Sequence, residues 1–191
     1  MQSKLIEVIS QKVQLTAEDI ELCKKYFEAV SFTKNEIIEE QDKIPEYLYF
    51  IVSGFMRLFY YDGNGDEVTT QINYNNSFTA SYMRFIHGIK AKENVECITD
   101  CALLRISKPN LKTLIDTSDN FKVFSLMIFE QAITIAENRA DELATLSAEQ
   151  RYKKLLHEKP EILQNVPIQY IASYLGMKPE SLSRIRRQMN G

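Results

Sequence analysis

The stretch that decides the fold is IQYIASYLGMKPESLSRIRRQ, residues 168–188. Counted from its first residue, apolar side chains occupy positions four, eight, ten, fifteen and eighteen, while the fifth residue is Ala172 and the ninth is Gly176. Two helices that cross at a steep angle need a small residue where their backbones meet and a glycine in the left-handed turn between them. Pro167 and Pro179 suit the first turns of the two helices. The segment therefore predicts a helix-turn-helix rather than an ordinary helical hairpin.

The second helix of this segment has a polar outer side once Leu182 and Ile185 face inward. That side is where a recognition helix meets the major groove of DNA. Arginine can donate to both acceptors of guanine and glutamate can accept from cytosine, so we expect Arg184 and Glu180 to read bases, with Ser181 at a base or a phosphate. The alternative is that Glu180 and Arg184 form an exposed helix ion pair. The predicted DNA-binding residues are Lys178, Glu180, Ser181, Arg184, Arg186, Arg187 and Gln188.

Charge is unevenly distributed along the chain. Residues 151–191 carry eight Lys and Arg against three Glu, a net +5, so the preceding part carries −8 of the total of −3. An acidic body with a basic end is typical of a protein whose small terminal domain binds a polyanion. We expect Lys178, Arg186 and Arg187 to contact phosphates, which fix the register without reading sequence. The predicted partner is double-stranded DNA.

The middle of the chain has a different pattern. Residues 36–107 are rich in β-branched and aromatic side chains, which alternate over residues 68–74, and DGNG at 62–65 is a tight-turn signal. This pattern predicts short antiparallel strands in a barrel or jelly roll. Before them, residues 16–30 open with a capping-box pattern and predict a helix.

Residues 120–146 predict one long helix with two apolar stripes. The first stripe consists of Phe121, Phe124, Ile128, Ala132, Ile135, Leu143 and Leu146. The second consists of Leu126, Phe129, Ile133, Ala136 and Ala140. One stripe can cover the strands and the other would lie bare on a monomer, so we expect a homodimer built on a helix pair. The alternative is a helix buried between two domains of one chain. A capping box at Ser147 and Gln150 predicts the next helix, which Pro160 closes.

The composition, 191 residues with 45% hydrophobic and 26% charged, is that of a folded protein. No run of 18 apolar residues and no signal-peptide pattern occurs, so we expect a cytoplasmic protein that does not bind membranes. Cys97 and Cys101 are four residues apart, but His87 and His157 lie far away in the sequence, so no metal site is expected. Without a phosphate-binding glycine loop, a nucleophile elbow or a metal motif, we expect neither an enzyme nor a bound cofactor.

Three stretches resemble the Crp/Fnr family of bacterial transcription regulators: LYFIVSGFMRLFYYDGNGDEV, LSAEQRYKKLL and VPIQYIASYLGMKPESLSRIRRQ. The resemblance implies an α+β fold with a jelly-roll sensor domain like a cyclic-nucleotide-binding domain (1–118), a dimerisation helix (119–146) and a DNA-binding helix-turn-helix domain (147–191). Its wing would be short or absent. In the family a Glu and an Arg of the recognition helix contact bases, and they match Glu180 and Arg184. RNA polymerase is a further candidate partner.

The sequence departs from the family where members that bind cyclic AMP hold their ligand. After Phe78 come Thr79 and Ala80 in place of Gly-Glu, and the expected Arg falls near Ala91. A lysine beside that position cannot replace the bidentate fork of arginine, so no response to cyclic AMP is expected. The candidate residues of this degenerate pocket are Phe78, Ala80, Ser81, Lys90 and Lys92. We expect a sequence-specific transcriptional regulator on an inverted-repeat site, or alternatively a small-ligand sensor whose unidentified ligand controls DNA binding.

Overall fold

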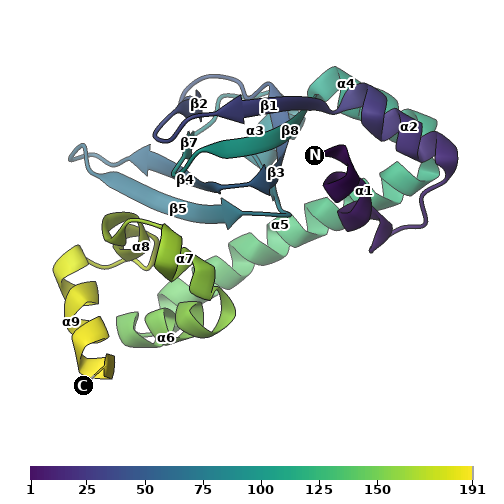
Figure 1. The fold of residues 1–191 in the computed structure, drawn as a ribbon. Coiled ribbons are helices and arrows are strands. Elements are labelled where there is room, and N and C mark those ends of the chain that lie inside the picture. Colours follow the sequence, from purple (N-terminus) through teal and green to yellow (C-terminus); the bar gives the residue numbers. More distant parts are fainter. Residues whose placement is uncertain (191) are drawn as a thin grey trace.

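Two four-stranded antiparallel sheets pack face to face as a β-roll (Figure 1). The computed structural model describes residues 1–190. Its strands are β1 (Glu28–Phe32), β2 (Ile37–Glu39), β3 (Tyr47–Ser53), β4 (Phe55–Tyr61), β5 (Glu67–Tyr74), β6 (Phe78–Thr79), β7 (Asn94–Cys97) and β8 (Cys101–Ser107). The strand orders are β1-β8-β3-β6 and β2-β7-β4-β5. Apolar side chains from both sheets, among them Ile51, Leu58 and Leu103, fill the space between them.

Two helices precede the strands, α1 (Gln2–Ser10) and α2 (Ala17–Tyr26). The capping box that opens α2 is formed by Thr16 and Asp19, as predicted. The predicted helix over residues 16–30 is too long, because its last residues belong to β1 and pair with β8. Backbone pairing with a distant strand outweighs the weak local preference for helix.

The tight turn predicted at residues 62–65 joins β4 and β5 in a hairpin, as expected. The regular alternation predicted over residues 68–74 is wrong, because the register of the hairpin shifts at Thr70 in a β-bulge. A bulge inserts one extra residue and changes which side chains share a face. Thr69 and Ile72, three residues apart, are therefore both buried toward the C-terminal helices.

A helix of 27 residues, α5 (Asp119–Thr145), runs along the β-roll to the C-terminal domain (Figure 1). Phe121 and Phe124 of the first stripe, near the start of α5, are buried against the roll, so this part of the helix covers the strands. Further along the same stripe, Ile135 and Leu143 are exposed. The same exposure contradicts the alternative of a helix buried between two domains of one chain.

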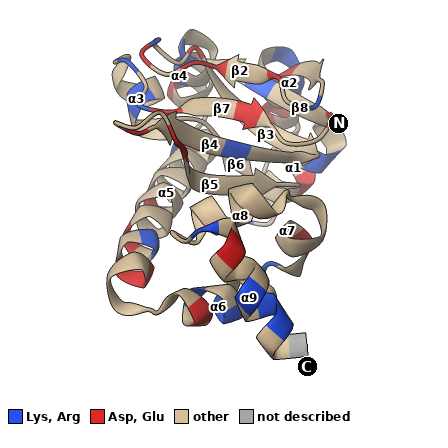
Figure 2. Cartoon of the chain, turned by 90° about the vertical axis from the view of Figure 1, so that its left-hand side faces the viewer, with Lys and Arg blue, Asp and Glu red and all other residues tan. Residues whose placement is uncertain are grey.

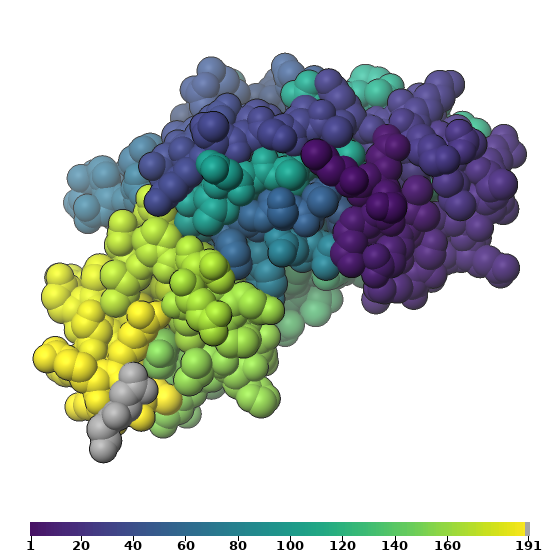
Figure 3. Space-filling model, in the orientation of Figure 1, coloured from purple at the N-terminus to yellow at the C-terminus, as the bar shows by residue number. Residues whose placement is uncertain are grey.

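The helices that follow α5 form a domain at one end of the molecule, in contact with the roll (Figure 3). The remaining helices of the described chain are α3 (Tyr82–His87), α4 (Lys108–Thr117), α6 (Ala148–Glu158), α7 (Pro160–Asn165), α8 (Ile168–Tyr174) and α9 (Pro179–Asn190). The capping box of α6 at Ser147 and Gln150 is formed as predicted. Within residues 1–190 no strand follows β8, so the described chain has no wing hairpin. No described helix combines the length and apolar character that crossing a membrane requires.

Candidate DNA-binding surface

The turn between α8 and α9 has the geometry of a helix-turn-helix. Gly176 adopts the left-handed conformation, with φ of 66°. Its N–H donates to the Ser173 carbonyl at 3.0 Å, and the Met177 N–H donates to the Ala172 carbonyl at 3.0 Å. These two bonds are a Schellman motif, which satisfies the last carbonyls of α8. A Cβ at Gly176 would lie 3.1 Å from the Leu143 side chain, so both conformation and space favour glycine.

The orientation of α9 follows the predicted periodicity. Leu182 and Ile185 are buried in the core of the C-terminal domain. The outer face of α9, formed by Glu180, Arg184, Arg187 and Gln188, is exposed. Lys178 in the turn is exposed and Ser181 is half-buried. In Figure 2, blue segments along α9 mark Lys and Arg positions at the end of the molecule away from the strands. All seven predicted DNA-binding residues therefore retain at least part of their surface, but the guanidinium of Arg186 differs from the others.

Arg186 lies differently from its neighbours. Its Nε and Nη2 atoms are shielded from solvent and have no hydrogen-bond partner among the described residues, and its guanidinium lies 5.8 Å from the Tyr152 ring. This position does not favour the phosphate contact predicted for Arg186. The periodicity could not show it, because Arg186 is displaced only about 100° around the helix from Ile185.

The exposed ion pair considered for Glu180 and Arg184 is not formed among the described residues. Both side chains are exposed, and neither forms an ion pair with another described residue. Their hydrogen-bonding groups are therefore available to another molecule.

Two arginines that the sequence analysis did not single out bind the C-terminal end of α8. Arg151 of α6 donates from Nε to the Leu175 carbonyl at 2.8 Å and from Nη1 to the Leu146 carbonyl at 2.5 Å. Arg139 of α5 donates to the Tyr174 carbonyl, and burial lowers the pKa of its guanidinium. Helix ends leave carbonyl groups without partners, which such donors satisfy. The turn of the helix-turn-helix is thereby tied to both α5 and α6.

A cavity of about 1390 Å³ lies between the β-roll and α5, on the far side of β4 and β5 from the C-terminal domain. Of the predicted pocket residues, Phe78, Ala80, Ser81 and Lys92 line it. Lys90 is exposed and does not line it, which corrects that prediction.

Arg84 of α3 adds a cation to the cavity wall that the sequence analysis missed. The hydroxyl of Ser81 is buried and has no partner among the described residues. Ala80 and Ala91, the two positions at which the resemblance implied a loss of charged groups, are buried. The described chain shows no cluster of three or more His, Cys, Asp or Glu side chains that could hold a metal ion.

Comparison with known proteins agrees with this arrangement. Residues 29–118 match the cyclic nucleotide-binding domain. No curated protein sequence matches the chain at a significant level.

Solved structures extend the likeness beyond the cyclic nucleotide-binding domain. FixK2 from Bradyrhizobium japonicum is 18% identical with a TM-score of 0.76, over 86% of this chain and 84% of that one. The c-di-GMP responsive global regulator CLP of Xanthomonas campestris is 19% identical with a TM-score of 0.71, over 92% of both chains. A Eubacterium rectale protein assigned to transcriptional regulators of the Crp/Fnr family is 17% identical with a TM-score of 0.71, over 92% of this chain and 84% of that one. The chain has the fold of Crp/Fnr regulators, which confirms the predicted fold class.

Proposed function

We propose that the protein is a sequence-specific transcriptional regulator of the Crp/Fnr type that binds an inverted-repeat DNA site as a homodimer. The observation that carries the proposal is the outer face of α9, which presents exposed Arg184 and Glu180 beside a correctly built helix-turn-helix turn. Recognition helices of a dimer enter successive major grooves about 34 to 36 Å apart. The proposal includes action in the cytoplasm, with RNA polymerase as a candidate partner, and no catalytic activity.

Selection of binding sites from random DNA tests this function. We expect an inverted repeat with half-site centres about one helical turn apart. Arg184→Ala should cost about 1 to 3 kcal/mol per half-site and relax the preference at one guanine, because a bidentate contact to a base edge is lost. Affinities for the selected site and for each single-base variant of it give both quantities.

Lys178→Ala is the matched control, since Lys178 is an exposed cation next to α9 that is assigned to a phosphate. Its loss should weaken binding to all sequences alike and reduce the slope of affinity against salt concentration by about one unit per contact. Selection that yields no palindrome contradicts the proposal. So does an Arg184→Ala variant whose base preference is unchanged.

The cavity favours a second, compatible function, the binding of a small effector that controls DNA binding. Its wall combines apolar side chains such as Phe78 and Leu58 with the cations Arg84 and Lys92 and the unpaired Ser81 hydroxyl. Cavities of about 300 to 1,000 Å³ with a few convergent polar groups are typical ligand sites, and this cavity of about 1390 Å³ is larger than that range. We propose that cyclic AMP is not this effector, because the two charged groups that would hold its ribose and phosphate are replaced by buried alanines.

A further inference from the structure

Arg57 of β4 is a buried cation in the interface between the β-roll and the DNA-binding domain. Its side chain is 1% exposed. Nε donates to Glu96 of β7 at 2.5 Å, and Nη2 donates to Glu67 of β5 at 2.5 Å. The guanidinium lies 4.0 Å from the ring centre of Phe59 and 3.6 Å from that of Tyr170, which belongs to α8. A buried arginine whose face is covered by an aromatic ring has little freedom to move, since its charge needs these partners in place.

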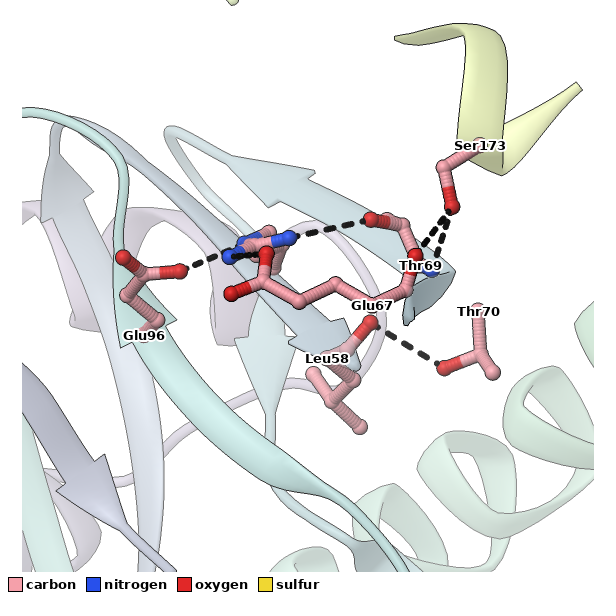
Figure 4. A network of polar contacts seen from close by, with 7 residues as sticks. Leu58, Glu67, Thr69, Thr70, Glu96 and Ser173 are labelled. Carbon is pink, nitrogen blue, oxygen red and sulfur yellow. Dashed lines mark hydrogen bonds and ion pairs between the residues drawn. The ribbon is translucent and has the colours of Figure 1, made fainter. Parts of the chain in front are cut away.

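A second contact joins the same two domains at the edge of the sheet. β5 is an edge strand, so its outer N–H and C=O groups have no neighbouring strand. Ser173 of α8 satisfies one group of each kind: its Oγ accepts from the Thr69 N–H at 2.8 Å and donates to the Glu67 carbonyl at 3.1 Å (Figure 4). The first helix of the helix-turn-helix is thereby bonded directly to the β-roll.

Apolar packing surrounds these polar contacts. Ile72 of β5 and Ile98, which follows β7, belong to the same buried cluster as Ile171 and Leu175 of the C-terminal domain. Apolar surfaces alone permit sliding, whereas hydrogen bonds and a stacked guanidinium require one geometry. We name the polar contacts the interdomain joint. It consists of Arg57, Glu67, Glu96, Tyr170 and Ser173 together with the Thr69 N–H.

We propose that the interdomain joint is a positioning device, which fixes the orientation of α9 relative to α5 and so sets the distance between the two recognition helices of the dimer. This inference rests on the proposed function. The joint holds α8 by its roll-facing side, where Tyr170 and Ser173 lie, and leaves the outer face of α9 exposed. It therefore positions the DNA-binding surface without covering it.

The test separates positioning from intrinsic DNA binding. Full-length protein is assayed on one half-site, and on inverted repeats whose half-sites are moved apart by single base pairs. Tyr170→Leu combined with Ser173→Ala removes the stacking and the edge contact while keeping apolar volume. Tyr170→Phe, which keeps the ring over Arg57, is the matched control. Arg57 itself is left in place, because its loss would strand buried Glu96 without a cation.

Wild type and Tyr170→Phe should prefer one spacing. The double variant should bind the single half-site with the affinity of the wild type. Its affinity for the best-spaced repeat should fall about tenfold or more, because two misoriented recognition helices cannot both bind their half-sites at the full effective concentration. Its affinity should also become nearly independent of spacing. Ser173→Ala alone, the milder variant, should show the same trend and faster hydrogen exchange at the Thr69 amide.

Two results would contradict the proposed positioning role of the interdomain joint. One is a double variant with the spacing preference of the wild type. The other is an equal loss of affinity for the half-site and the full repeat together with a lowered Tm, since that is the signature of a general loss of stability. A wild-type chain that selects no DNA sequence would contradict the proposed function and, with it, the positioning role of the interdomain joint. This outcome can be told apart from the others because it appears before any variant is compared.

Discussion

Glu39 and Arg186 are charged residues with polar side-chain atoms that are buried in the protein. Glu39 is 8% exposed, and only its Oε1 accepts a hydrogen bond, from the Tyr47 N–H at 3.4 Å. Burial raises the pKa of this carboxyl to about 7, and the charge of nearby Glu46 acts in the same direction. Neither position shows in the sequence, because burial depends on which distant segments cover a side chain.

The Glu39 carboxyl predicts a pH-dependent stability. Its pKa in the folded protein lies above the ordinary value of 4.5, so the folded state holds the proton more tightly than the unfolded state. The free energy of unfolding should therefore fall as pH rises from about 4.5 to about 7. Glu39→Gln, which resembles the neutral acid, should raise Tm relative to the wild type more at pH 8 than at pH 5.

Exposed Glu40 provides the control for this measurement. Glu40→Gln removes the same charge from the neighbouring residue, and its effect on Tm should be small at both pH values because exposed ion pairs contribute little. If Glu39→Gln shifts Tm equally at pH 5 and pH 8, the carboxyl does not titrate as described.

At the scale of elements, α5 shows how one helix can serve two surfaces. Its start is buried against the roll through Phe121 and Phe124. Beyond Phe124 the helix presents apolar side chains to solvent, among them Leu126, which is 58% exposed. Ile133 lies two turns further along on the same side of the helix as Leu126 and is 40% exposed. A contiguous apolar strip on a helix surface is typical of a subunit contact.

We expect Leu126→Lys to turn the dimer into a monomer. The substitution places a charge without a partner at the subunit contact, at a cost on the order of several kcal/mol. Light scattering on the full-length protein measures the change in mass. Ile44→Lys is the control, because Ile44 is 54% exposed in the segment between β2 and β3, away from α5. A wild-type chain that is monomeric at micromolar concentration would contradict the prediction.

In the whole molecule, the cavity and the C-terminal domain lie on opposite sides of the same two strands. Leu58 of β4 and Gln71 of β5 line the cavity, whereas Arg57 and Thr69 on the same strands contact the C-terminal domain. A shift of β4 or β5 on the cavity side therefore also moves the side chains of these strands that contact the C-terminal domain.

Cyclic AMP should leave the thermal stability unchanged. A ligand present at 100 times its dissociation constant adds about 2.7 kcal/mol, which in a chain of this length corresponds to about 5 to 10 °C in Tm. With Ala80 and Ala91 in place of charged groups, we expect no such shift in a melting experiment with cyclic AMP. A clear upward shift would mean that other cavity residues, such as Arg84 and Lys92, bind the nucleotide.

The helix-turn-helix, the tight turn at residues 62–65 and the capping boxes could all be predicted from the sequence. These features depend on backbone conformation and on partners three or four residues away, so a glycine at 176 or a threonine at 16 is sufficient signal. The assignment of Glu180 and Arg184 to the outer side of α9 followed from the same local periodicity.

The features that join distant segments could not be predicted from the sequence, because they depend on the tertiary structure. The end of α2 at Tyr26 depends on pairing between β1 and β8, and the burial of Arg57 depends on α8 covering the edge of β5. The bond from the Thr69 N–H to Ser173 spans 104 residues of sequence. Such contacts leave no periodic pattern in the sequence. In each of them, a residue from one segment completes a hydrogen bond or covers an apolar surface of a segment far away in the chain.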